Sequence, residues 1–140
     1  MRIRSALLLG LCVSWNICFA AGAGLHLQAA YVTASLPGTT TVAAYLELKN
    51  LSKQEWVLVS ASSPAAHVVE VHRHVMEGNS MRMEKVDSLP IPAGGIVRMQ
   101  PGGYHLMLIG LNKALSTGDH VLVTLKFSNG RAETVVLNVK

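Results

Sequence analysis

The stretch HVLVTLKFSNGRAETVVLNV, residues 120–139, indicates the fold class of the chain. Each half is rich in β-branched and other apolar residues that alternate with polar ones, the pattern of a strand with one buried face. Between the halves lies Asn129-Gly130, a pair that tolerates the positive φ required at both central positions of a type I′ turn. We therefore predict a β-hairpin in which residues 120–127 and 133–139 are the strands.

The same pattern recurs from residue 25 onward. Short runs with β-branched and aromatic residues are separated by turn residues at intervals of about 8 to 12 residues, which is typical of a β-sandwich. The other strands that we predict are residues 25–33, 42–48, 55–61, 67–75, 81–86, 96–99 and 105–109. The predicted turns between them include Pro37-Gly38, Gly78-Asn79 and residues 90–95. A chain of 140 residues is long enough for one hydrophobic core, so we predict an all-β single domain over residues 25–140.

The first twenty residues have the features of a secretory signal peptide. Arg2 and Arg4 precede a short apolar run, and small residues follow it. A membrane anchor is the alternative, but polar residues interrupt the apolar run, which is shorter than the roughly 20 residues that a spanning helix needs. We predict that residues 1–20 are removed, with cleavage as late as residue 23, and that the mature protein has no stable membrane span.

Cysteine and charge content exclude several classes of function. Cys12 and Cys18 both lie in the predicted signal peptide, so the mature chain has no disulfide, thiolate ligand or cysteine nucleophile. Its 10 basic and 8 acidic residues are scattered, which argues against a nucleic-acid partner. The chain also lacks a nucleophile with a plausible base, a paired acid motif and a phosphate-binding loop, so we do not expect an enzyme.

Histidine and methionine residues cluster in the middle of the chain. In YHLML, His105 and Met107 are two residues apart, so they share one face of a strand while Leu106 and Leu108 occupy the other. One short strand therefore presents two soft donor atoms on the same side.

Two other predicted strands carry similar residues. Glu70, His72 and His74 share one side of VVEVHRHV, and Met81 and Met83 share one side of MRM. His74 is a candidate auxiliary ligand, or it only flanks the site. Glu70 would either orient a ligating imidazole or be an ordinary solvated strand residue.

A mixed set of thioethers and imidazoles favours Cu(I), because thioether sulfur is soft and uncharged. Zinc would more naturally recruit thiolate, imidazole or carboxylate ligands. An electron-transfer cupredoxin is disfavoured because its blue-copper site needs a cysteine thiolate. A binding or adhesion module with incidental histidines and methionines remains the alternative. If cleavage exposes Gly24 as the amino terminus, the free amine, two backbone amides and the imidazole of His26 are a candidate square-planar Cu(II) site.

The spacing of four of these residues resembles the PCu(A)C family of periplasmic copper chaperones. His72 is followed after ten residues by Met83, after twenty-one more by His105, and after one more by Met107. The flanking segments that resemble this family are VAAYLELKN at 42–50, ASSPAAHVVEVH at 61–72 and IPAGGIVRMQPGGYHLML at 91–108.

The resemblance implies a cupredoxin-like Greek-key β-sandwich that binds one Cu(I) in the periplasm. It implies that the ligands are His72, Met83, His105 and Met107. It also implies delivery of copper to an acceptor such as the copper centre of cytochrome c oxidase, sometimes with a Sco-type thiol protein. His74 departs from the family pattern, in which methionine is often found at this position.

Overall fold

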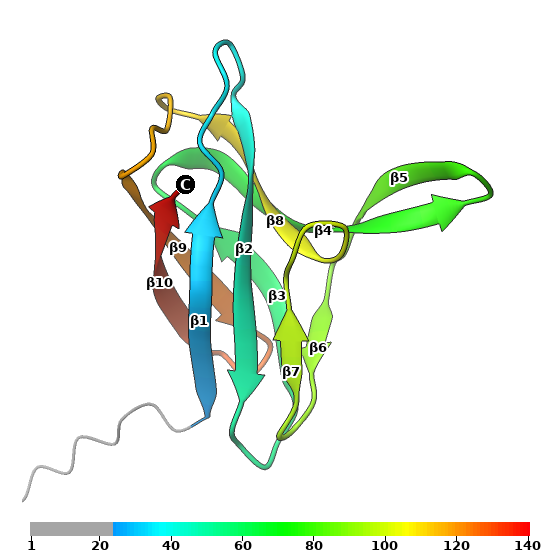
Figure 1. Ribbon diagram of the computed structural model, residues 1–140. Coiled ribbons are helices and arrows are strands. Elements are labelled where there is room, and N and C mark those ends of the chain that lie inside the picture. The colour runs from blue at the N-terminus through cyan, green and yellow to red at the C-terminus, as the bar shows by residue number, and fades with distance from the viewer. Residues whose placement is uncertain (1–23) are drawn as a thin grey trace, which may run out of the picture.

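The computed structural model describes residues 24–140 and contains ten strands and no helix in this range (Figure 1). The predicted signal peptide, residues 1–20, lies outside the described residues. No helix of residues 24–140 has the length and apolarity to cross a membrane. The strands are β1 (Leu25–Val32), β2 (Thr41–Asn50), β3 (Trp56–Ser62), β4 (Ala66–Glu77), β5 (Ser80–Lys85), β6 (Leu89–Ile91), β7 (Ile96–Arg98), β8 (His105–Leu111), β9 (His120–Phe127) and β10 (Ala132–Val139).

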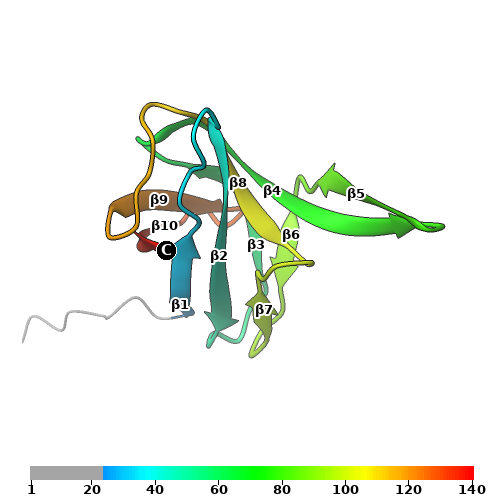
Figure 2. The same cartoon turned by 45° about the horizontal axis from the view of Figure 1, so that its top comes forward.

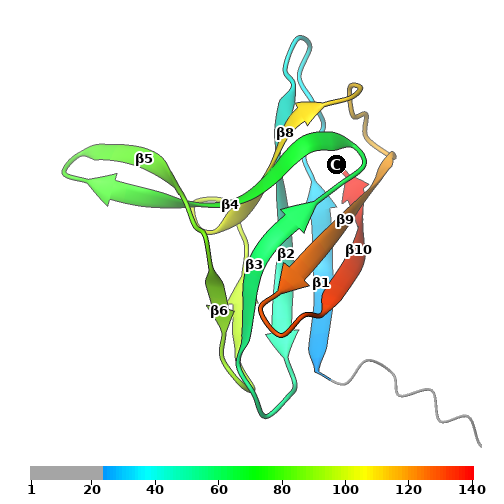
Figure 3. The same ribbon diagram turned by 180° about the vertical axis from the view of Figure 1, so that it is seen from behind.

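The strand pairings close around one core. Their order is β5-β4-β8-β2-β1-β10-β9-β3-β6, with β7 paired to β2 and an additional pairing between β3 and β4. Strands β1, β2 and β8 form one layer, and β3, β9 and β10 form the other (Figures 1 and 3). Strands β1 and β10 pair in parallel, and the other pairs are antiparallel. The predicted all-β, cupredoxin-like sandwich is confirmed.

Alternate residues of the strands form the core. In β2 every second residue from Val42 to Leu48 is buried, and in β9 every second residue from Val121 to Phe127 is buried. Asn50 is a buried polar residue at the end of β2, and its side-chain amide donates hydrogen bonds to the carbonyl oxygens of other segments, including that of β6. The period of two therefore separates an apolar inner face from an outer face on which polar side chains can gather.

Strand β6 was not predicted, because Pro90 led us to expect a turn over residues 90–95. Proline cannot donate a hydrogen bond to a neighbouring strand, but it is tolerated in an edge strand. In the described chain β6 pairs only with β3, and Leu89 and Ile91 on either side of the proline are buried in the core.

The hairpin between β9 and β10 is confirmed, but its predicted type I′ turn is wrong. Asn129 does not have the positive φ that this turn needs, whereas Gly130 has a φ of 82°. The amide of Gly130 donates to the carbonyl of Phe127 at 3.1 Å, and the amide of Phe127 donates to the carbonyl of Arg131 at 2.9 Å. The connection is therefore a three-residue loop closed by a left-handed glycine.

The hairpin of β4 and β5 projects from the sandwich (Figures 1 and 2). Strand β4 has 12 residues, and His72 is its last residue to pair with β8. From Arg73 onward β4 pairs only with β5, around a two-residue turn at Gly78, whose φ is 63°. Strand β4 thus belongs to the sandwich at its start and to the projecting hairpin at its end.

Candidate metal centre

The two predicted imidazole ligands are direct neighbours on adjacent strands. His72 of β4 is paired with His105 of β8, and their ring centroids are 6.0 Å apart. The preceding pair, Val71 and Leu106, is buried in the core. Because side chains alternate along a strand, both imidazoles lie on the opposite side of the sheet, which we call the outer face.

The two predicted thioether ligands lie on the same outer face. Met107 is paired with Glu70, one same-face position from the histidine pair, and Met83 of β5 is paired with His74, one position away in the other direction. The structure therefore brings all four predicted residues to one region of three neighbouring strands. Within residues 24–140 no group of three or more histidine, cysteine, aspartate and glutamate side chains is arranged to hold a metal, and the predicted set combines two histidines with two methionines.

His105 has a fixed tautomer and is almost fully buried. Only 2% of its surface is exposed, and its Nδ1 donates a hydrogen bond to the carbonyl oxygen of Gly103 at 3.0 Å. Its other nitrogen, Nε2, therefore carries the lone pair that a metal would need. Burial lowers the pKa of His105 below its ordinary value, and the Gly103 carbonyl opposes this only in part. The imidazole is consequently neutral at pH 7 and ready to act as a ligand.

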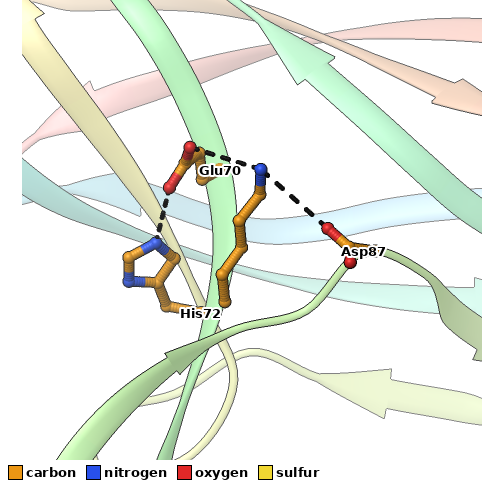
Figure 4. Close-up of polar contacts among 4 residues, drawn as sticks. Glu70, His72 and Asp87 are labelled. Atoms are coloured by element: carbon orange, nitrogen blue, oxygen red, sulfur yellow. Dashed lines mark hydrogen bonds and ion pairs between the residues drawn. The ribbon is translucent and has the colours of Figure 1, made fainter.

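His72 has one satisfied and one unsatisfied ring nitrogen. Its Nε2 lies 2.8 Å from the carboxylate Oε2 of Glu70 (Figure 4). Its Nδ1 is buried and has no hydrogen-bond partner. A buried polar atom without a partner is costly, and a metal ion would satisfy this one. The carboxylate–histidine pair also has the arrangement by which proteins commonly orient a metal-binding imidazole.

Glu70 is itself held by neighbouring charges. The ammonium of Lys85 lies 3.5 Å from its Oε1 and 3.9 Å from Asp87, so the carboxylate lies between an imidazole and a cation (Figure 4). The hydrogen bond from His72 lowers the pKa of Glu70, and the charge of Lys85 adds to this effect, although burial opposes it. The group is therefore ionised at neutral pH and can accept a hydrogen bond from Nε2 of His72.

We predict that Glu70→Gln weakens metal binding without unfolding the protein. The amide is nearly isosteric but carries no charge to hold His72, and loss of such an outer partner typically costs about 10- to 100-fold in metal affinity. A competition titration with a colorimetric Cu(I) chelator would measure the change. Glu47→Gln is the matched control, because Glu47 is also a partly buried carboxylate with a cationic partner, Arg98, at 2.9 Å. Equal affinities of the two variants would contradict a positioning role for Glu70.

We also predict that the copper-free protein loses stability as the pH falls below about 6.5, the ordinary pKa of histidine. The unfolded chain takes up a proton on His105 near that pH, whereas burial lowers the pKa of this group in the folded chain. The unfolded state then binds more protons, so the free energy of unfolding decreases with falling pH. Urea unfolding between pH 7.5 and 5.5 would measure the slope. The slope should be smaller in His105→Gln, and an unchanged slope in that variant would contradict the assignment.

Two further residues lie beside this region and were not predicted from the sequence. Tyr45 of β2 has its ring centroid 6.3 Å from that of His105, and Lys85 holds Glu70. No local signal marks either residue, because each reaches its partner only through strand pairing. His26, the candidate for a Cu(II) site, lies in β1 and is paired with Lys49.

Comparison with known proteins places the chain in a family. A family model described as "Putative lipoprotein LpqE-like" matches residues 25–139. The chain belongs to the LpqE-like family. A relative from Leifsonia xyli subsp. xyli, named "Putative lipoprotein Lxx21020", is 36% identical over 118 residues, which are 84% of this chain and 70% of the relative.

Solved structures of PCuAC domains and related copper proteins resemble this member of the LpqE-like family. The solution structure of Cu(I)-DR1885 from Deinococcus radiodurans is 36% identical, with a TM-score of 0.66, over 86% of this chain and 83% of that one. The copper-bound PCuAC domain of PmoF2 is 22% identical, with a TM-score of 0.71, over 84% of this chain and 92% of that domain. The similarity to PmoF2 concerns the fold. The predicted resemblance to the PCu(A)C family is confirmed.

Proposed function

We propose that this protein is a copper chaperone that carries one Cu(I) ion on His72, Met83, His105 and Met107. The observation that carries the proposal is the direct pairing of His72 with His105 on the outer face, with the two methionines at adjacent positions of that face. The 36% identity to DR1885, whose solution structure is of a Cu(I)-bound protein, supports the same conclusion.

The donor atoms follow from the hydrogen bonds of the two histidines. His105 would bind through Nε2, because its Nδ1 is bonded to Gly103, and His72 would bind through Nδ1, because its Nε2 is bonded to Glu70. Neutral imidazoles and thioethers suit Cu(I), a soft ion, and leave its positive charge uncompensated. Such a site binds less tightly than a thiolate site and favours release to an acceptor.

Transfer would begin at Met83. This residue lies in β5 of the projecting hairpin (Figure 1) and is 55% exposed, whereas His105 is buried. An incoming donor can therefore displace the Met83 thioether while the histidines still hold the ion. Exchange of one ligand at a time avoids a free Cu(I) ion, so the site suits a carrier and needs no catalytic group.

The cellular setting belongs to the same proposal. We infer that residues 1–20 direct export and that the mature protein works in the periplasm. The acceptor would be a copper site in another protein, such as the copper centre of cytochrome c oxidase, and a Sco-type thiol protein would be a further partner. The resemblance to periplasmic PCu(A)C chaperones and the description of the LpqE-like family as lipoproteins support this setting.

X-ray absorption spectroscopy of the Cu(I)-loaded protein would test the ligand set. We expect a first shell of two sulfur and two nitrogen neighbours. A shell without sulfur would contradict the proposal, and a shell with one sulfur would remove one methionine from it. Failure to retain Cu(I) in the presence of a competing chelator would favour a binding module without a metal role.

A further inference from the structure

The projecting hairpin has two chemically different faces. On one face, Arg73 is ion-paired with Glu84 at 3.1 Å and Arg82 with Glu77 at 2.9 Å. Charged side chains are the residues normally found at solvent-exposed positions, so this face needs no further explanation.

The opposite face of the hairpin carries soft donors instead. The pairing of His74 with Met83 and of Met76 with Met81 puts all four side chains on the outer face. Met76 and Met81 are 64% and 60% exposed. Among the described strands, β5 pairs only with β4, so no other strand covers these methionines.

Core packing does not account for Met76 and Met81. Methionine is commonly a flexible filler of apolar interiors. Met99 has that role in this protein, because only 3% of its surface is exposed. The two hairpin methionines lie in solvent beside a histidine and fill no gap.

Two of the donors are already close enough to share an ion. Nδ1 of His74 lies 3.1 Å from the sulfur of Met81, to which it donates a hydrogen bond, and a bound metal ion would take the place of that proton. Bonds of about 2.0 Å to nitrogen and about 2.3 Å to sulfur, the lengths seen at tetrahedral zinc, place the two donor atoms about 3.5 Å apart. A small outward movement of one exposed side chain is enough to admit a metal between them.

We propose that His74, Met76 and Met81 form a second Cu(I) site on the hairpin, which we call the hairpin site. This inference rests on the proposed copper-carrier function. The hairpin site has three donors and is exposed, so it binds Cu(I) more weakly than the four-ligand site. The two sites are adjacent: the ring of His74 lies 5.0 Å from that of His105, and Met83 is paired with His74. An ion bound at the hairpin site is therefore held beside the ligands of the four-ligand site.

The hairpin site can be tested by NMR of the protein labelled with ¹³C at the methionine methyl groups. The protein would be titrated with Ag(I), a diamagnetic stand-in for Cu(I). We expect the methyl signals of Met83 and Met107 to move with the first equivalent and those of Met76 and Met81 with the second. The signal of buried Met99 is the internal reference. If Met83 and Met107 respond but Met76 and Met81 do not, the hairpin site is refuted while the four-ligand site stands. If none of the four responds, both proposals fail.

Variants of the hairpin provide a second test. Met76→Leu combined with Met81→Leu keeps the side-chain volume, so we expect loss of the second equivalent of Cu(I) and unchanged affinity for the first. His74→Gln should weaken the second equivalent at least tenfold. His120→Gln is its matched control, because His120 is an exposed histidine of β9 that bonds to Asn138. Unchanged binding of the second equivalent by the double methionine variant would overturn the inference.

Discussion

Replacing both Met83 and Met107 by leucine is expected to abolish retention of Cu(I) while the β-sandwich stays folded. Leucine has nearly the volume of methionine but no sulfur, so the change removes two of four proposed ligands and preserves packing. Met83 is largely exposed and Met107 is half-buried, so the structural cost is below about 1.5 kcal/mol for each site. The affinity should fall by more than the ~100-fold that loss of one outer-shell partner can cost. Competition with a Cu(I) chelator would measure it.

Met99→Leu is the control for this prediction. It makes the same chemical change at a methionine that is buried in the core, so the stability of the fold can change while the Cu(I) affinity should not. Circular dichroism would verify that both variants are folded. Parent-like affinity of the Met83/Met107 double variant would show that the ligand assignment is wrong.

Replacing Leu106 by alanine is expected to cause a large loss in the free energy of unfolding. Leu106 lies between His105 and Met107 in β8, points to the inner side of the sheet and is fully buried. A buried leucine-to-alanine change costs about 2–5 kcal/mol, because it removes apolar contacts and leaves a cavity. Domains of this size are stable by only about 5–15 kcal/mol. Urea unfolding of the copper-free protein would measure the loss.

Leu122→Ala is the matched control for the core variant. Leu122 also lies within a strand, β9, but 48% of its surface is exposed. Surface substitutions usually change the free energy of unfolding by less than about 0.5 kcal/mol. Equal losses in the two variants would contradict the assignment of the inner and outer faces. Added Cu(I) should also raise the unfolding midpoint of Leu106→Ala, because an ion that binds only the folded state stabilises it.

Local patterns in the sequence predicted which residues share a face. The alternation in YHLML puts His105 and Met107 on one side of β8, and the structure buries Leu106 and Leu108 on the other. The hairpin of β9 and β10 was predicted from its two strand patterns and from the turn signal at Asn129-Gly130. These predictions succeed because the period of two in a strand is a property of neighbouring residues. Prediction from local pattern fails where strand pairing outweighs the preference of a residue for a turn. In β6, Pro90 suggested a turn but lies within an edge strand paired with β3.

By itself, then, the sequence determined the strand class, the faces of individual strands and, through the spacing that resembles PCu(A)C proteins, four candidate ligands. Only the tertiary structure decided that His72 meets His105, that Met83 meets His74 and that Glu70 leaves Nδ1 of His72 unpartnered. The physical reason is strand register. Backbone hydrogen bonds can form in many registers, and a slip of one residue moves every side chain of a strand to the opposite face. Burial of the core on both layers selects one register, and that selection involves residues far from the site in sequence.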